Sequence, residues 1–189
     1  MIEFSVIVLA GGRSSRMGSN KALVPYLGKP LISYAIDLAC NFTRTIIISA
    51  NTPDLDHLGF KVVHDELPVK APIAGIHAGL KASLTDWSLV LTCDMPNVNS
   101  TLIHQLLAEM SDNYRLVLPS HDGFLEPLCG FYHKEMLPVI EQNVRNGKFS
   151  LLDLLDLVPH KLVPSRDEPV GNGISRLFRN VNEKKDLLS

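Results

Sequence analysis

A glycine-rich, basic segment directly follows a short apolar run near the start of the chain. The segment reads AGGRSSRMGSNK and covers residues 10–21, and the apolar run covers residues 4–9. Glycines let backbone N–H groups approach an anion closely, and Arg13, Arg16 and Lys21 add positive charge. These residue types predict a phosphate-binding loop. The alternative is a solvated connection between a strand and a helix, whose basic side chains face water.

The spacing of the glycines excludes two common kinds of phosphate loop. The segment has no GxGxxG, which disfavours a dinucleotide-binding turn, and no GxxxxGK[ST] runs through Gly11, Gly12 and Gly18. What remains is a long loop at the carboxyl end of the first strand. Open α/β sheets bind their ligands at that edge.

A carboxylate is expected at the same edge of the sheet. Asp94 follows the apolar run WSLVLT, and Pro96 lies two residues farther on. Mg²⁺ needs only one or two protein oxygens when substrate phosphates supply others. Asp94 is therefore a candidate ligand for Mg²⁺. The alternative is that Asp94 is a turn residue or a helix cap.

The elements that must position these residues alternate along the chain. Strands are expected at residues 4–9, 44–49, 61–64, 87–92 and 114–118, and helices at 30–40, 73–82, 102–110, 135–146 and 150–157. This alternation predicts an α/β fold, a three-layer sandwich with a mostly parallel central sheet. Residues 125–133 (LEPLCGFYH) can form an edge strand, a bulged strand or a lining loop, because proline and glycine interrupt an apolar run. Residues 165–173 are expected to form a mobile loop.

Composition limits the classes of function. The chain has 189 residues, 46% of them hydrophobic, with 18 Lys+Arg against 20 Asp+Glu and three cysteines without a CxxC pair. We expect one domain over residues 1–189, reduced cysteines, and no nucleic acid partner because no basic cluster exists. The first apolar run is too short for a signal core or a membrane span, so we expect a cytoplasmic protein with no membrane partner.

Short motifs along the whole chain resemble those of a known enzyme family. They are LAGG (Leu9–Gly12), RMG (Arg16–Gly18) with Lys21, GKPL (Gly28–Leu31), PIAG (Pro72–Gly75), CDMP (Cys93–Pro96), and NVN (Asn180–Asn182) followed by Asp186-Leu187. This set resembles the nucleotidyltransferases of the nucleotide-diphospho-sugar transferase type. Within them, it is similar to the molybdenum cofactor guanylyltransferase (MobA) family.

The resemblance implies a Mg²⁺-dependent transfer of GMP from GTP to molybdenum-bound molybdopterin, with release of pyrophosphate; Mn²⁺ is an alternative metal. It further implies that other cofactor-biosynthesis proteins and the molybdoenzymes that accept the product are partners. The nucleotide contacts that it implies are Leu9, Ala10, Gly11, Gly12, Lys21, Ser49, Asp65 and Asp94, with Asn180 and Asn182 as substrate or second metal contacts. Ser49 departs from the asparagine that is common in the family.

The chemistry of the reaction assigns roles to these residues. Arg16, Lys21 and the amides of the glycine turn are expected to stabilise the leaving pyrophosphate, with Asp94 holding the metal. Asp65 is suited to accept from the N1–H and the exocyclic amine of guanine. Two alternatives remain at this point: a molybdopterin cytidylyltransferase or sugar-type nucleotidyltransferase, and a non-catalytic nucleotide-binding adaptor that delivers the cofactor.

Overall fold

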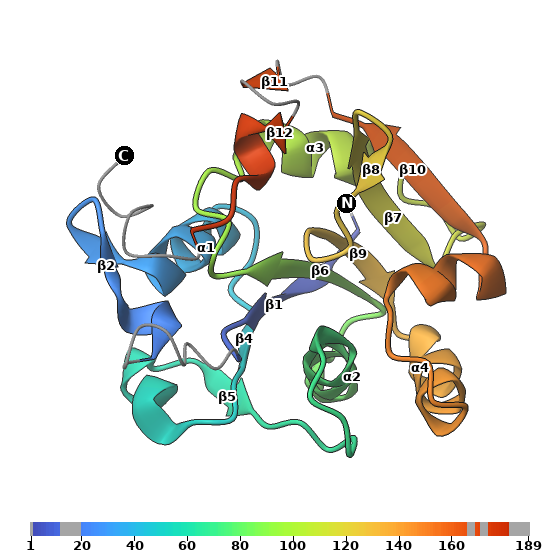
Figure 1. The fold of residues 1–189 in the computed structure, drawn as a ribbon, viewed down its shortest axis with the longest axis horizontal. Helices are drawn as coiled ribbons and strands as arrows, with labels where there is room; N and C mark the ends of the chain where they lie inside the picture. The colour runs from blue at the N-terminus through green and yellow to red at the C-terminus, as the bar shows by residue number, and fades with distance from the viewer. Residues whose placement is uncertain (1, 12–19, 166–168, 171–173, 182–189) are drawn as a thin grey trace.

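The computed structural model describes residues 2–11, 20–165, 169–170 and 174–181 (Figure 1). The main strands are β1 (Phe4–Leu9), β4 (Ile46–Ser49), β5 (Lys61–Val63), β6 (Trp87–Thr92), β7 (Leu116–His121), β9 (Gly130–His133) and β10 (His160–Pro164). The helices are α1 (Leu31–Cys40), α2 (Pro72–Ala82), α3 (Ser100–Ala108) and α4 (Met136–Arg145). The expected alternation of strands and helices is confirmed.

Shorter elements connect this framework. They are the hairpin strands β2 (Pro25–Tyr26) and β3 (Lys29–Pro30), the strands β8 (Phe124–Leu125), β11 (Pro169–Val170) and β12 (Ile174–Ser175), and the 3-10 helices η1 (Lys21–Leu23), η2 (Pro53–Leu58), η3 (Leu152–Leu157) and η4 (Arg176–Phe178). The strands β11 and β12 lie inside or next to the expected loop 165–173, and its remaining residues are only partly described.

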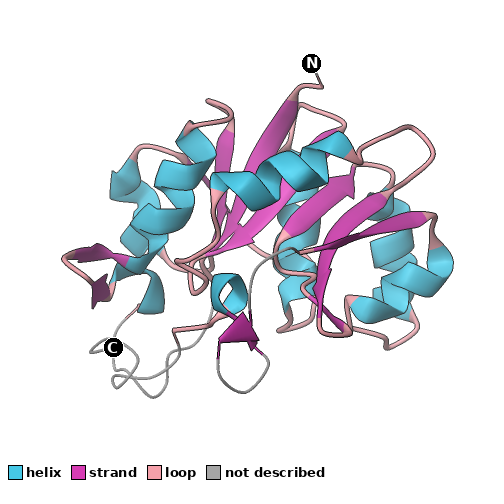
Figure 2. Ribbon diagram, turned by 90° about the horizontal axis from the view of Figure 1, so that it is seen from above, coloured by secondary structure: helices cyan, strands magenta, loops and turns pink. Residues whose placement is uncertain are grey.

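One twisted sheet runs through the described part of the chain in the order β10-β7-β9-β6-β1-β4-β5, with β8 paired to β7 (Figure 2). The pairs β10–β7, β6–β1, β1–β4 and β4–β5 are parallel, whereas β9 is antiparallel to both β6 and β7. The expectation of a mostly parallel sheet is confirmed. Residues 125–133 were expected to form an edge strand, a bulged strand or a lining loop, but their last four residues form β9, a central strand between β6 and β7.

The strand β9 explains why a glycine lies within an apolar run. A Cβ on Gly130 would lie 2.5 Å from Leu118 Cδ2 and 2.7 Å from the Val117 carbonyl oxygen. The neighbouring strand β7 therefore leaves room only for glycine at this position. Phe131 and Tyr132 follow it and are fully buried, one on each face of the sheet.

Helices cover both faces of the sheet, as Figure 1 shows with α1 and α3 on one side and α2 and α4 on the other. The alternating residues of β1 divide between the two cores. Val6 and Val8 pack with residues of α1 and α3, whereas Ile7 and Leu9 pack with residues of α2 and α4. This arrangement is the expected three-layer sandwich.

The bounds of most elements differ by one or two residues from the sequence-based expectation, and three differences concern the sheet or the type of helix. The strand expected to begin at Arg44 begins at Ile46, and the strand expected over 114–118 covers Leu116–His121. It continues through Pro119 because β10 pairs alongside it, with Val163 opposite Pro119. The segment 150–157 forms the 3-10 helix η3 rather than a regular α-helix.

Two local signals mark helix ends in the structure. Asn99 caps α3, since its side chain accepts a hydrogen bond from the Leu102 N–H at 3.0 Å. Gly147 follows α4 with a φ of 74°, a conformation that glycine adopts without strain. Among the described residues, no helix has the length and apolar character needed to span a membrane.

Candidate functional site

The carboxyl ends of four neighbouring strands form one rim. The β1 residue Leu9 lies opposite Ser49 of β4 and opposite Thr92 of β6, and Ser49 lies opposite Val63 of β5. The residues that follow these strands therefore emerge together. This rim contains Gly11, Asp65 and Asp94, which the sequence predicted as site residues from separate parts of the chain.

Lys21 and Asp94 form an ion pair at the rim. The Lys21 Nζ donates to Asp94 Oδ2 at 2.8 Å, and the two side chains are 15% and 22% exposed. Thr92 Oγ1 donates to the other carboxylate oxygen, Oδ1, at 2.7 Å. Both oxygens of Asp94 are thus held, one by a cation and one by a hydroxyl group. The structure brings together the two residues to which the sequence assigned the phosphates and the metal.

Local structure fixes the position of each partner in this ion pair. Asn20 caps the short helix η1, since its side chain accepts a hydrogen bond from the Ala22 N–H at 3.1 Å. This cap fixes the backbone on either side of Lys21. The Asp94 carbonyl oxygen accepts from the Val181 N–H at 2.9 Å. A segment near the end of the described chain therefore anchors the loop that carries the carboxylate.

The glycine turn is described only at its start. Leu9 and Ala10 are buried, Gly11 is exposed, and the Ala10 N–H donates to the Ser49 carbonyl oxygen at 2.9 Å. The predicted site residues Gly12 and Arg16 lie outside the described residues, as does Asn182. Asn180 is described and exposed, directly before the Val181 that binds the Asp94 loop.

A second polar group lies farther along the rim, at the ends of β4 and β5. The Asn51 Nδ2 donates to Asp65 Oδ2 at 2.7 Å, and the Asp65 N–H donates to Asn51 Oδ1 at 2.9 Å. Asn51 was not among the predicted site residues. Its place two residues after a strand end, the same offset as Asp65, is the signal in the sequence that could have identified it.

Ser49, the expected nucleotide contact on β4, is almost fully buried at 2% exposure. A Cβ on Gly75 of the PIAG motif would lie 2.7 Å from Ser49 Oγ, 3.2 Å from Leu9 Cδ2 and 3.6 Å from Asp65 Oδ1. Helix α2 can therefore approach the rim this closely only with glycine at position 75. The PIAG motif thus has a steric role in placing α2 beside the predicted base-contacting residues.

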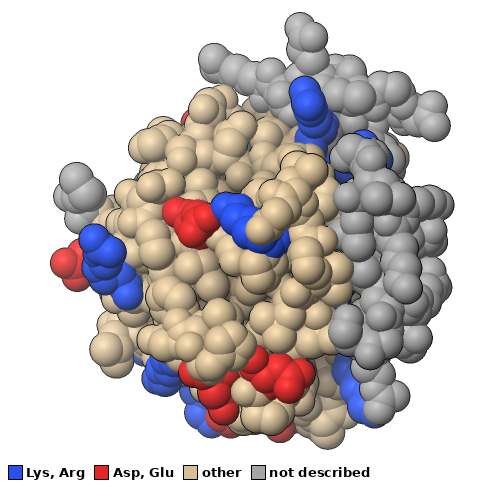
Figure 3. All heavy atoms as spheres, turned by 90° about the vertical axis from the view of Figure 1, so that its left-hand side faces the viewer, with Lys and Arg blue, Asp and Glu red and all other residues tan. Residues whose placement is uncertain are grey.

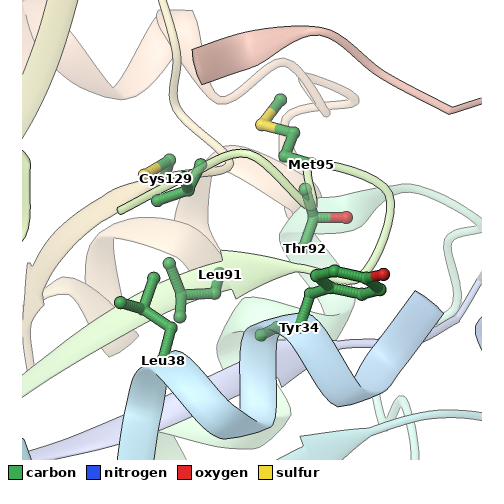
Figure 4. Close-up of a pocket in the computed structure, with 8 residues that line it drawn as sticks. Tyr34, Leu38, Leu91, Thr92, Met95 and Cys129 are labelled. Carbon is green, nitrogen blue, oxygen red and sulfur yellow. The ribbon is translucent and has the colours of Figure 1, made fainter. Parts of the chain in front are cut away.

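Two hollows lie near the rim. A shallow pocket of about 440 Å³ opens between the end of β5 and α2, and Asp65, Glu66 and Lys81 are among its lining residues. A much smaller cavity of about 10 Å³ lies behind the Asp94 loop, where Tyr34, Thr92, Met95 and Cys129 surround it (Figure 4). Its volume is about that of one water molecule, so it is a packing feature rather than a substrate site.

Charge is spread thinly over the described surface. Among the described residues that Figure 3 shows, Lys and Arg side chains lie scattered, and several acidic side chains gather at the lower edge. Exposed ion pairs such as Lys29–Asp37 and Lys81–Glu66 neutralise several of these charges. Hydrogen bonding to Lys81 lowers the pKa of Glu66.

The cysteines next to the site are suited to packing rather than to nucleophilic chemistry. Burial raises the pKa of Cys93 to about 12, with a further contribution from the Asp94 charge, and burial raises that of Cys129 to about 12 as well. A thiol with such a pKa is not ionised near neutral pH. The three cysteines are free thiols, as the sequence predicted.

The donor set at Asp94 can hold a hard cation only with help from a substrate. Within the described residues, no cluster of three or more His, Cys, Asp or Glu side chains can hold a metal ion. One carboxylate, partly exposed beside a lysine, would be the minimal protein contribution to a metal that phosphate oxygens also bind. The arrangement can therefore support phosphoryl or nucleotidyl transfer.

Comparison with known proteins agrees with this geometry. The family profile described as MobA-like NTP transferase domain matches residues 6–160. A molybdenum cofactor guanylyltransferase from Vibrio atlanticus is 34% identical over 189 residues, covering 98% of this chain and 94% of that protein. One from Syntrophotalea carbinolica is 32% identical over 186 residues, covering 97% of this chain and 88% of that protein.

Solved structures show the same fold at lower sequence identity. Molybdopterin-guanine dinucleotide biosynthesis protein A from Archaeoglobus fulgidus superposes with a TM-score of 0.79 at 24% identity, covering 98% of this chain and 95% of that one. A 2-C-methyl-D-erythritol 4-phosphate cytidylyltransferase from Thermus thermophilus has a TM-score of 0.72 at 14% identity, covering 99% and 96%. With the profile match over most of the chain and relatives above 30% identity, the chain belongs to the MobA-like NTP transferase family and is a nucleotidyltransferase of that family.

Proposed function

We propose that this nucleotidyltransferase transfers GMP from GTP to molybdenum-bound molybdopterin and forms the guanine dinucleotide cofactor. The relatives named as molybdenum cofactor guanylyltransferases, which align over nearly the whole chain, support the choice of both substrates. The observation that carries the chemistry is the Lys21–Asp94 pair on the rim, with Asp65 on the same edge.

The reaction that fits this site is a single displacement at phosphorus. A terminal phosphate oxygen of molybdopterin attacks the α-phosphorus of GTP, the bond from that phosphorus to the bridging oxygen breaks, and pyrophosphate leaves with both electrons of that bond. The attacking phosphate is already ionised at neutral pH, so no general base is required. Charge builds up on the leaving group, and stabilising it is the main task of the protein.

Lys21 is proposed to bind the phosphates of GTP, together with Arg16 and the backbone amides of Gly11 and Gly12. In the structure the Asp94 carboxylate neutralises the Lys21 ammonium group. Arrival of the triphosphate offers Lys21 a more highly charged anion. We infer that the ion pair keeps Lys21 at the rim until the nucleotide replaces Asp94 as its partner.

Asp94 is proposed to hold Mg²⁺, with Mn²⁺ as an alternative, and Asn180 and Asn182 are proposed as substrate or second metal contacts. The fit rests on a partly exposed carboxylate whose second oxygen is oriented by Thr92. When bound, the metal would draw charge from the phosphate oxygens and offset the negative charge of Asp94. Asp94 would hold the metal close to Lys21, because the two side chains form an ion pair on one rim.

Asp65 is proposed to select guanine, with Leu9, Ala10 and Ser49 forming the floor beneath the nucleotide. A carboxylate accepts from both the N1–H and the exocyclic amine of guanine, whereas cytosine offers only its amine.

The partners expected outside catalysis are other cofactor-biosynthesis proteins and the molybdoenzymes that receive the product, and we place the reaction in the cytoplasm.

The test is turnover of molybdenum-bound molybdopterin with each of GTP, CTP and ATP, with Mg²⁺ and after chelation of divalent metals. We expect a guanine dinucleotide and stoichiometric pyrophosphate with GTP, and little product with the other nucleotides or without metal. Faster turnover with CTP would assign the protein to the cytidylyltransferases. Nucleotide binding without any transfer would support the adaptor alternative.

A further inference from the structure

Asn51 and Asp65 hold each other through two hydrogen bonds of opposite direction. The Asn51 amide donates to one oxygen of the Asp65 carboxylate at 2.7 Å, and the Asp65 backbone N–H donates to the Asn51 side-chain oxygen at 2.9 Å. Because the two bonds close a ring, neither side chain can rotate without breaking at least one of them. An otherwise solvated carboxylate is thus held in one orientation.

The backbone beneath this pair is fixed as well. The Ala50 N–H donates to the Val63 carbonyl oxygen at 3.0 Å, which extends the pairing of β4 and β5 beyond the end of β4. The Ala50 carbonyl oxygen lies 2.6 Å from His64 Nδ1. Asn51 and Asp65 therefore project from two chain segments that are themselves tied together, and small changes in their side chains should not displace the rim.

The pair leaves the other carboxylate oxygen facing helix α2. Asp65 Oδ1 lies 3.6 Å from the position that a Cβ on Gly75 would take, whereas Asn51 binds Oδ2. The two oxygens thus have different surroundings: one is occupied by an amide, and one faces a residue without a side chain. A carboxylate offers about four lone-pair directions, so the bond to Asn51 leaves acceptor capacity on both oxygens.

We propose that Asn51 is a positioning residue for guanine recognition, which acts by orienting the Asp65 carboxylate toward the base. This inference rests on the proposed function, in which Asp65 accepts from the N1–H and the exocyclic amine of guanine. Asn51 brings an amide to the rim two residues after Ser49, the last residue of β4. Its effect on the nucleotide passes through Asp65 and not through a contact of its own.

Inosine triphosphate is the probe that isolates this effect, because it has the N1–H of GTP but lacks the exocyclic amine. We expect the wild-type protein to bind GTP about tenfold more tightly than inosine triphosphate, as expected for loss of one hydrogen bond to a charged acceptor. In Asn51→Ala the ratio should fall to about threefold or less, chiefly through weaker GTP binding. Isothermal titration calorimetry gives both dissociation constants without any need for turnover.

A double-mutant cycle separates positioning from direct contact. If Asn51 acts through Asp65, then adding Asn51→Ala to Asp65→Ala should change GTP binding less than twofold, because the carboxylate it orients is already gone. A further loss as large as in the wild-type background would mean that Asn51 binds the nucleotide itself, and would overturn the proposal. An unchanged ratio of GTP to inosine triphosphate in Asn51→Ala would overturn it too.

Two controls complete the design. Asn113→Ala removes an exposed asparagine from the turn between α3 and β7 and should leave the ratio at its wild-type value. Asn51→Asp places a second carboxylate against Asp65 and should weaken GTP binding more than Asn51→Ala does; tighter GTP binding than in Asn51→Ala would count against the proposal. If the wild-type protein prefers CTP to GTP, the proposed function itself fails. If the wild-type protein prefers GTP and Asn51→Ala keeps the wild-type ratio of GTP to inosine triphosphate, only the role of Asn51 fails.

Discussion

Replacing Asp94 with alanine should have opposite effects on nucleotide binding and on turnover. In the structure the Asp94 carboxylate binds the Lys21 ammonium group, which is proposed to bind the triphosphate. Asp94→Ala removes this competitor and also removes a negative charge from the rim. We therefore expect the variant to bind GTP more tightly than the wild type when divalent metal is chelated, while its metal-dependent turnover is nearly lost.

The size of the effect follows from the geometry of the pair. At the 2.8 Å separation of Nζ and Oδ2, the Coulomb energy is ~1.5 kcal/mol in water and ~6 kcal/mol at an effective dielectric constant of 20. Desolvation and side-chain ordering offset most of the larger value, and fully exposed pairs contribute at most ~1 kcal/mol. Because the two side chains are 15% and 22% exposed, we take a contribution slightly above that of an exposed pair. A value of ~1.4 kcal/mol corresponds to about tenfold tighter GTP binding without metal.

The assay is calorimetric titration of GTP into both proteins, once with excess chelator and once with Mg²⁺. Mg²⁺ should strengthen binding to the wild type and have little effect on Asp94→Ala, so the order of affinities should reverse between the two conditions. Asp37→Ala is the matched control, since it also breaks a lysine–aspartate pair, with Lys29, but away from the carboxyl rim. Weaker GTP binding by Asp94→Ala in chelator, or unchanged metal dependence, would refute this reasoning.

The remaining predictions concern the residues around the same rim. Steady-state kinetics of Lys21→Ala should show a loss of ~2–4 kcal/mol of transition-state stabilisation. Lys21→Arg should recover only part of this loss, because a planar guanidinium group replaces a point charge. If Lys21→Ala changed only the Tm, the role of the lysine would be structural. Gly75→Ala should lower the free energy of unfolding by ~1–3 kcal/mol in urea titrations, because its Cβ would lie 2.7 Å from Ser49 Oγ; an unchanged midpoint would contradict the tight packing. Asp65→Asn should narrow the preference for GTP over CTP more than Ser49→Ala does, as competition binding would show, since only the first removes the charged acceptor. Cys93 should resist alkylation at pH 8 in the folded protein and react after denaturation, because burial raises its pKa to about 12. Mass spectrometry of the labelled peptide measures this difference. Rapid labelling of Cys93 in the folded protein would contradict the prediction.

Local patterns in the sequence were sufficient to predict the layers of the fold. Apolar runs of strand length alternate with helical periodicity, and burial of both faces of such strands requires helices on both sides. The structure confirms this with α1 and α3 on one face and α2 and α4 on the other. The cap of α3 at Asn99 was likewise predictable, because capping depends on neighbouring residues alone.

Residues 125–133 could not be assigned from the sequence, because local preference does not determine strand order. Proline and glycine in this run argue against a central strand, yet β9 lies in the middle of the sheet. The close approach of β7 explains the glycine, since a Cβ on Gly130 would meet Val117 and Leu118. That contact joins segments that are distant along the chain, so only the tertiary structure reveals it.

For the candidate site, too, the sequence determined some features and the tertiary structure determined others. Residue types and motifs identified Lys21, Asp65 and Asp94 individually, because phosphate, metal and base binding each need a particular functional group. The tertiary structure decided which of them meet: Lys21 binds Asp94 across 73 positions in the sequence, and Asp65 binds Asn51, which no motif had indicated. These pairings depend on the register of parallel strands, which places the carboxyl ends of β1, β4, β5 and β6 on one rim through hydrogen bonds between segments far apart in the chain.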